Sequence, residues 1–332
     1  MKLLIVIVNY RTPDLTVECL QSLATEIATI PGTVRVVVCD NCSEDESVFK
    51  IQKAIETNKW DWATLLELPT NGGFAYGNNR GIMPALKSEN PPQYVYLLNP
   101  DTVVLPDALR ELVKFMDEHS YCGIAGGRAV NPDGTVRNSA FRFHTVLSEF
   151  EGSIRLGVVS KMLKEHIVAS PPPETPQQVE WVSGASMIIR KDVFDHVGML
   201  DEGYFMYYEE TDFCLRASKA GWPTFYVPSS KIIHLVGQSS GVTGAQRTAK
   251  RRPAYWFESR HRYFRRHYGA MKTFAADFLW AGGYAVGSLL QKVRGKPRTD
   301  PPWLWWDFVR YNLKDYFRKP RAGAAGAEAA TN

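Results

Sequence analysis

The stretch Leu3-Leu-Ile-Val-Ile-Val-Asn9 decides the fold class of this 332-residue chain. Its run of leucine, isoleucine and valine predicts a strand that is buried on both faces. Similar runs recur at 34–39, 63–68 and 94–98, and segments with helical periodicity separate the first of them. The helix after the first strand opens at Thr12-Pro13, where proline is favoured. This alternation predicts an α/β fold with a central, mostly parallel sheet covered by helices on both faces.

Polar residues follow the predicted strands at the edge where ligands bind such sheets. In an open parallel sheet that edge lies at the carboxyl ends of the strands. Asn9 and Tyr10 follow the first strand, Asp40 follows the second, and Asn99-Pro100-Asp101 follows the fourth. A carboxylate at such a position can hold a divalent ion that is shared with a diphosphate. We therefore expect a binding site at this edge, although an Asn-Pro-Asp sequence is also a common turn.

A glycine-rich segment and a lone histidine are further candidates. The segment Thr70–Gly81 contains four glycines, which allow a backbone to approach a ligand closely, and a helix start that can face a phosphate. A tight loop into a helix explains the same residues without any ligand. His234 stands alone near the end of a strand, and a lone histidine is usually structural.

Three carboxylates follow an aromatic run in the stretch Gly203–Arg216. Glu209, Glu210 and Asp212 fall in the first turn of a predicted helix, where the helix dipole favours negative charge. The preceding run Phe205–Tyr208 is expected to desolvate them and raise a carboxyl pKa, as suits a general base. Simple capping of the helix by the three acids is the competing interpretation.

Composition and charge narrow the class of protein. The chain is 45% hydrophobic and 22% charged, and its five cysteines give no disulfide framework. The first apolar run is too short for a signal peptide, and no stretch reaches the roughly 18–20 apolar residues of a membrane span. We expect a cytoplasmic protein, either free or peripheral on the cytoplasmic face of the membrane.

The C-terminal region is strongly basic and rich in aromatic residues. Residues 245–321 carry 18 Lys and Arg against five Asp and Glu, although the net charge of the whole chain is only +4. A basic, tryptophan-rich, amphipathic segment is typical of elements that lie on an anionic membrane. Packing against the catalytic part or against another copy of the chain is the alternative. No nucleic-acid motif accompanies the charge, so nucleic acid is not an expected partner.

Taken in order, the motifs resemble those of the family 2 inverting glycosyltransferases, particularly the bacterial rhamnosyltransferase-like branch. The resemblance covers about residues 3–268. It rests on Val8-Asn9-Tyr10, Asp40-Asn41, Asn71–Gly81, Asn99-Pro-Asp101, Trp181–Ala185, Glu209-Glu-Thr-Asp212 and His234.

The resemblance implies a glycosyltransferase A-type, Rossmann-like fold with a C-terminal helical extension. Its expected divisions are a catalytic domain, an extension and a disordered tail, at 1–244, 245–320 and 321–332. Within the catalytic domain, 1–101 would bind the nucleotide sugar and 102–244 the acceptor, with a mobile loop at about 144–179.

The resemblance also implies roles for individual residues. Glu210 takes the position of the catalytic base, and Asp101 with His234 takes that of the metal ligands, for Mg²⁺ or Mn²⁺. Residues expected to bind the nucleotide sugar are Asn9, Tyr10, Arg11, Asp40, Gly73, Asn79, Asn99 and Asp101. Residues expected to bind the acceptor are Trp181, Ser183, Gly184, Glu209 and Asp212.

The implied activity is transfer of a sugar, with L-rhamnose from dTDP-rhamnose favoured, onto a saccharide or lipid-linked acceptor in cell-surface polysaccharide synthesis. A UDP-linked hexose, galactofuranose or N-acetylhexosamine is the alternative donor, and a non-catalytic nucleotide-sugar-binding protein is the alternative class. Two residues depart from the family pattern: Asn99 replaces the first acid of the metal motif, and Glu210 replaces an aspartate. The second departure leaves Glu209 or Asp212 as an alternative base. Assembly into a homo-oligomer is left open.

Overall fold

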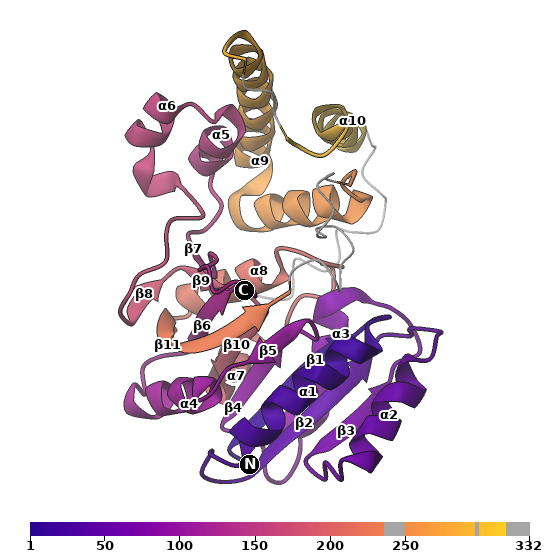
Figure 1. Ribbon diagram of the computed structural model, residues 1–332. Coiled ribbons are helices and arrows are strands. Elements are labelled where there is room, and N and C mark those ends of the chain that lie inside the picture. Colours follow the sequence, from indigo (N-terminus) through magenta and orange to yellow (C-terminus); the bar gives the residue numbers. More distant parts are fainter. Residues whose placement is uncertain (236–249, 296–298, 317–332) are drawn as a thin grey trace.

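The computed structural model describes residues 1–235, 250–295 and 299–316, and it begins with the predicted alternation of strands and helices (Figure 1). The first elements are β1 (Leu3–Asn9), α1 (Pro13–Ile27), β2 (Val34–Asp40), α2 (Ser47–Thr57), β3 (Ala63–Glu67), α3 (Gly73–Leu86), β4 (Tyr94–Leu98), β5 (Thr102–Val104) and α4 (Ala108–Glu118). Strands β3, β2, β1 and β4 are adjacent and parallel. The predicted start of the sheet is confirmed.

Later strands extend the same sheet and make it mixed. The following elements are β6 (Ile124–Val130), β7 (Ala140–Phe141), β8 (Gln177–Val179), β9 (Trp181–Val182), β10 (Ser186–Arg190), α7 (Lys191–Val197), α8 (Glu209–Lys219) and β11 (Thr224–His234). The strand order of the large sheet is β3-β2-β1-β4-β10-β6-β11-β5, and β8 also pairs with β11. Strands β10, β5 and β8 run antiparallel to their neighbours, whereas β6 and β11 run parallel to each other.

Strand β1 is the centre of the core because its side chains alternate between two apolar layers. Leu3, Ile5 and Ile7 pack into the layer that contains buried residues of α1 and α2. Leu4 and Val6 pack into the opposite layer with residues of α3, α7 and α8. Burial on both faces explains the unbroken apolar run in the sequence.

The register of the short strand β5 brings distant parts of the chain together. β5 runs antiparallel to β11, and His234 lies opposite Thr102 in this pairing. The backbone N–H of Leu235 also donates to the carbonyl of Asp101. The end of β11 is therefore fixed beside the Asn99-Pro100-Asp101 turn that follows β4.

The segment 144–179 differs from the predicted loop. It contains α5 (Val146–Ile154), α6 (Gly157–Met162), the 3₁₀ turn η1 (Lys164–His166) and β8. Thr145 and Ser148 form a reciprocal capping box at the start of α5. The expectation of a loop was wrong for these elements, because α5 is stabilised by packing against α9, which lies more than 100 residues later.

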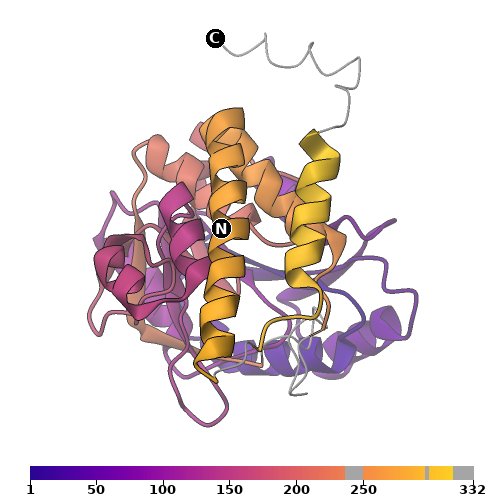
Figure 2. The ribbon, with the colours of Figure 1, turned by 90° about the horizontal axis from the view of Figure 1, so that it is seen from above.

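Two C-terminal helices form a layer above the sheet together with α5 and α6 (Figure 1). They are α9 (Ala254–Val293), which turns at the non-helical Gly269, and α10 (Leu304–Tyr316). Seen from above, the second half of α9 lies between α5 and α10 (Figure 2). In the described residues, no helix has both the length and the apolar character that crossing a membrane requires. The predicted disordered tail, 321–332, lies outside the described residues.

Candidate active site

A cavity of about 480 Å³ lies at the carboxyl ends of β1 and β4. Residues from the whole length of the described chain line it, including the turn after β4, the start of α8, the end of β11 and the start of α9. The predicted site residues that line it are Tyr10, Gly73, Asn99, Asp101, Ser183, Gly184, Glu209, Glu210 and His234. The fold therefore gathers nine of the predicted positions around one cavity.

Asp101 and His234 form a close pair at this cavity. The Nε2 atom of His234 lies 3.4 Å from Oδ1 of Asp101 and 3.5 Å from Nδ2 of Asn99. The Asp101 side chain is almost fully buried, with 1% exposure, and that of His234 is 15% exposed. A carboxylate and an imidazole are both suitable ligands for a divalent cation such as Mn²⁺.

The pair fits a cation that takes its remaining ligands from a substrate. Among the described residues, no group of three or more His, Cys, Asp or Glu side chains is arranged to hold a metal. Ions that bridge a protein to phosphates commonly use only one or two carboxylates, and the phosphates supply further oxygens. The donor set of Asp101 and His234 suits that type of site rather than a closed structural one.

Backbone conformation at the start of α8 places the two glutamates at the cavity. Tyr207 and Tyr208 both have φ of 70°, in the left-handed region that non-glycine residues seldom adopt. Each such residue costs about 1–3 kcal/mol, and the conformation persists only where the surrounding structure imposes it. The turn leads directly into Glu209, whose side chain is 3% exposed, and into the more open Glu210.

Burial changes the acidity of both glutamates. Burial raises the pKa of Glu210, while the backbone N–H groups of Glu210 and Gly184 and the charge of His144 oppose part of the rise. Burial and the adjacent Glu210 charge raise the pKa of Glu209 well above its usual range. Within the described chain, one oxygen of each glutamate, Oε2, is buried without a hydrogen-bond partner. Glu210 lines the cavity, and a carboxylate with a raised pKa suits a general base.

Gly73 allows the glycine-rich segment to approach the loop before α8. It has φ of 87°, and a Cβ atom there would lie 1.9 Å from the carbonyl oxygen of Phe205. The next residue, Phe74, donates its backbone N–H to that same carbonyl. The glycine is therefore required for packing between two walls of the cavity, in addition to any contact with a ligand.

Three predicted nucleotide-binding residues lie next to the cavity without lining it. The Asp40 carboxylate accepts hydrogen bonds from Asn9 Nδ2 and from both the backbone N–H and the hydroxyl of Ser43. Arg11 donates to the carbonyl of Ser43 and pairs with Glu44. These bonds shape the 40–44 loop beside Tyr10, and a contact of Asp40 with a nucleotide base stays a prediction.

Three other predicted residues do not line the cavity, and their side chains have partners elsewhere in the chain. Asn79, expected to bind the donor, bonds instead to the backbone of Leu200 and to Glu202. Trp181, expected to bind the acceptor, donates to the carbonyl of Arg142 and stacks on Phe141.

Asp212, also expected to bind the acceptor, does not reach the cavity either. Its wholly buried carboxylate bonds to Arg216 Nε and His267 Nε2, each at 2.7 Å. Burial raises and these partners lower the pKa of Asp212, and the net shift is downward. The aspartate therefore anchors α8 to α9.

Aromatic residues that the motifs did not single out complete the cavity wall. Tyr255, at the start of α9, contacts the rings of Phe205 and Tyr207 at centroid distances of 5.2 and 6.2 Å. Nearby, the Ser259 hydroxyl donates to the carbonyl of Met206. The basic, aromatic character of this helix was visible in the sequence, but its contact with the cavity depends on tertiary packing.

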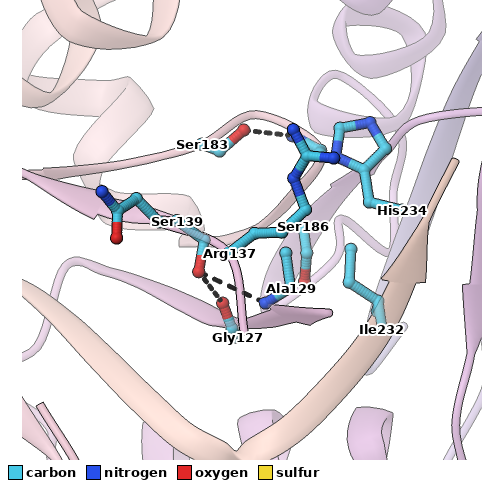
Figure 3. A pocket seen from close by; sticks show the side chains of 10 residues that line it. Gly127, Ala129, Arg137, Ser139, Ser183, Ser186, Ile232 and His234 are labelled. Atoms are coloured by element: carbon cyan, nitrogen blue, oxygen red, sulfur yellow. Dashed lines mark hydrogen bonds between the residues drawn. The ribbon is translucent and has the colours of Figure 1, made fainter. Parts of the chain in front are cut away.

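Arg137 was also missed. It lines a smaller pocket of about 130 Å³ that shares Ser183, Ala185 and His234 with the main cavity. Figure 3 shows its guanidinium beside the imidazole of His234. Its Nη1 donates to Asn131 Oδ1 at 2.8 Å, and no carboxylate of the described chain forms an ion pair with it. Arg137 thus brings a positive charge close to the Asp101 and His234 pair.

Comparison with known proteins bears on this site. Residues 4–197 match the sequence model of "Glycosyl transferase family 2". The chain is 31% identical over 244 residues to a Mycobacterium tuberculosis N-acetylglucosaminyl-diphospho-decaprenol L-rhamnosyltransferase, covering 69% of this chain and 73% of that protein. It is 31% identical over 174 residues to the Escherichia coli rhamnosyltransferase WbbL, covering 51% of this chain. That match spans 64% of the E. coli protein, less than two thirds.

A solved structure supports the fold. The chain resembles a Pyrobaculum calidifontis mannosyltransferase, solved with GDP-Man and Mn²⁺, with a TM-score of 0.53 and 13% identity. The superposition covers 96% of this chain and 81% of the other. The predicted glycosyltransferase A-type fold with a helical C-terminal region is confirmed.

Proposed function

Because the chain belongs to glycosyltransferase family 2, we propose that it transfers a sugar from a nucleoside diphosphate donor to a hydroxyl group of a saccharide or lipid-linked acceptor. L-Rhamnose from dTDP-rhamnose is the donor we favour, since relatives that are 31% identical are rhamnosyltransferases. The acceptor named for the mycobacterial relative is linked to decaprenol through a diphosphate. A lipid-linked acceptor in polysaccharide synthesis is the corresponding proposal here.

One observation carries the proposal: the Asp101 and His234 pair, whose side chains suit a divalent cation, and Glu210, whose pKa is raised, line the same cavity. Asp101 and His234 would hold Mg²⁺ or Mn²⁺, which would offset negative charge on the departing diphosphate. Glu210 lines the same space from α8. The proposed inverting transfer uses both features, one for the leaving group and one for the attacking hydroxyl.

In the proposed reaction, Glu210 accepts the proton of the acceptor hydroxyl as its oxygen attacks the anomeric carbon. The bond between that carbon and the diphosphate oxygen breaks in the same step, and its electron pair leaves with the diphosphate. Attack from the face opposite the leaving group inverts the configuration at the anomeric carbon. The neutral, protonated Glu209 next to Glu210 would keep a second negative charge away from the attacking oxygen.

Arg137 has a supporting role in this proposal. Its guanidinium lies beside His234 and lacks an ion pair within the described chain, so it can donate to a phosphate oxygen in a bidentate manner. Arg137→Leu and Arg137→Gln should each weaken donor binding more than they change the pH dependence of turnover.

Nucleotide-dependent thermal stabilisation, followed by a transfer assay, tests the proposal. At a hundredfold excess over its Kd, we expect dTDP with Mn²⁺ to stabilise the chain by about 2.7 kcal/mol relative to the free protein, and we expect UDP or GDP to stabilise it less. Asp101→Ala should abolish the Mn²⁺-dependent part of this stabilisation. Stabilisation by UDP alone would favour the alternative donors. Binding without transfer to any acceptor would favour a nucleotide-sugar-binding protein.

A further inference from the structure

The second half of α9 exposes a continuous apolar stripe. Met271, Phe274, Phe278, Val286, Leu289 and Val293 are all exposed, with Phe278 at 68% and Val293 at 79%. Their spacing of three, four or eight residues places them on one helical face. The gap in the stripe at 279–285 has only Gly282 and Ala285 exposed, so no charged side chain interrupts it. We call these six residues the apolar stripe; they span about 33 Å of helix.

The opposite face of the same helix is already packed. Gly283 and Gly287 lie so close to α5 that a Cβ atom would be 2.4 Å from Ser153 Oγ and 2.2 Å from the Ile154 carbonyl oxygen, respectively. Trp280 stacks on Phe308 of α10 at a centroid distance of 4.0 Å. Contacts within the chain therefore fix the rotation of α9 and leave the apolar stripe facing outward.

Cations without acidic partners surround the stripe. Five exposed basic residues on this layer form no ion pair within the described chain: Lys272, Lys292, Arg294, Arg310 and Lys314. The carboxylates of the same two helix segments are all engaged. Asp277 binds Arg260 and Tyr316, Asp307 binds Arg251, and Asp315 binds His261. The layer thus presents unbalanced positive charge together with apolar side chains.

Tryptophans extend the surface next to the stripe. Trp303 and Trp306, at the start of α10, are 65% and 61% exposed. Figure 2 shows α10 alongside the second half of α9, with α5 and α6 on the other side. In α6, Val158 and Met162 are also mostly exposed. Tryptophan and basic residues beside an apolar helix face are typical of elements that lie in the headgroup region of a bilayer.

We propose that the apolar stripe of α9 and the exposed face of α10 dock the protein on an anionic lipid membrane. The apolar side chains would enter the boundary between headgroups and acyl chains, and the five cations would contact anionic headgroups. Tyr255, at the other end of α9, lines the cavity, so docking through α9 would hold the cavity near the membrane surface. That docking helps the protein reach a lipid-linked acceptor rests on the proposed function. The docking itself does not depend on that function.

The charge distribution favours a membrane over a second copy of the chain. Two copies that met through this layer would bring ten of these cations to one interface, whereas the carboxylates of the second half of α9 and of α10 already have partners within the described chain. Like charges in contact at an interface oppose association. An anionic bilayer supplies both the apolar phase and the opposite charge.

Sedimentation with vesicles of phosphatidylcholine alone or with phosphatidylglycerol tests the docking on the full chain without any substrate. We expect binding that requires phosphatidylglycerol and weakens as salt rises. Phe278→Glu and Leu289→Glu should each weaken binding at least about tenfold. Arg310→Gln and Lys314→Gln should each weaken it about fivefold.

Phe49→Glu is the matched control, because Phe49 is 66% exposed but lies on α2, away from this layer. It should leave vesicle binding unchanged. Equal binding by the wild type and the Phe278→Glu and Leu289→Glu variants would overturn the proposal. So would a wild-type dimer in sedimentation velocity that Phe278→Glu converts to monomer while no vesicle binding is seen. Unchanged stabilisation by dTDP and Mn²⁺ in the variants would show that the fold and the donor site are intact, whichever result is obtained.

Discussion

Glu209 and Glu210 are neighbours in sequence, yet their surroundings give them different roles. Glu209 is almost fully buried and its pKa is raised well above the usual range, so it stays protonated when Glu210 is ionised. Two carboxylates this close seldom ionise together. Both residues are glutamates, so the difference between Glu210 as proton acceptor and Glu209 as its neutral neighbour follows from their different burial.

Substitution of the two glutamates by glutamine should therefore have unequal effects. Glu210→Gln removes the proton acceptor and should lower kcat at least about a hundredfold while donor affinity changes little. Glu209→Gln replaces a neutral acid by a neutral amide of similar shape and should keep most of the turnover. Steady-state kinetics with titrated donor would check this. Equal losses in the two variants would contradict the assignment of Glu210 as base.

The pH dependence of turnover should report the raised pKa of Glu210. An ionised base is required, so kcat should fall as the pH drops through a value above the ordinary carboxyl pKa of 4.5. The Glu209→Gln variant should show this acid limb at nearly the same pH, because Glu209 is already neutral there. An acid limb at or below 4.5 in the wild type would show that another group is titrating.

At the scale of elements, a buried charge cluster joins α5 to α9. The fully buried Arg260 of α9 binds Glu149 of α5 at 2.7 Å and also binds Asp277 across the turn at Gly269. Burial alone would raise the pKa of Glu149, but the charge of Arg260 and a bond from His144 bring it to about 2. The cluster connects the two halves of α9 with α5, which lies in the segment 144–179 that the sequence analysis predicted to be a loop.

Removing one charge from this cluster should destabilise the fold. Glu149→Gln leaves Arg260 under-compensated in the interior and should lower the free energy of unfolding by about 3–5 kcal/mol. Glu174→Gln breaks an exposed pair with Arg128 and should cost about 0–1 kcal/mol. Denaturant unfolding of the two variants provides the comparison, and similar small losses in both would contradict a structural role for the cluster.

The same cluster gives stability a defined pH dependence. Because the pKa of Glu149 is lowered from 4.5 to about 2, its contribution is complete above pH 4.5 and is lost as the pH falls through about 2. In the Glu149→Gln variant this part of the acid-induced loss should be absent.

At the scale of the whole molecule, the C-terminal helices are part of the site rather than an appendage. Tyr255 lines the cavity, Ser259 holds the Met206 carbonyl, and Arg262 pairs with Asp201 ahead of the aromatic run. Together with the His267 bond to Asp212, these contacts stabilise the strained turn that carries Glu209 and Glu210. The predicted catalytic domain, residues 1–244, therefore does not include Tyr255, which forms part of the cavity wall.

A chain truncated after residue 244 should accordingly fail as an isolated domain. Without α9, the buried Asp212, Tyr204 and α5 lose their partners, and we expect loss of cooperative thermal unfolding and of stabilisation by dTDP with Mn²⁺. A chain ending at residue 316 is the control and should behave like the full length. Nucleotide binding by the 1–244 fragment would show that the division is a true domain boundary.

The sequence by itself determined the parallel start of the sheet with the helices beside it, the family, and nine of the cavity-lining positions. These depend on local periodicity and on short motifs at strand ends, which are set by residues close in the chain. Only the tertiary structure decided where Asn79, Trp181 and Asp212 point, that 146–166 is helical, and that α9 completes the site. The reason is that each of these depends on a partner far away in sequence, as Asp212 depends on His267 and α5 on α9, and local patterns carry no record of such partners.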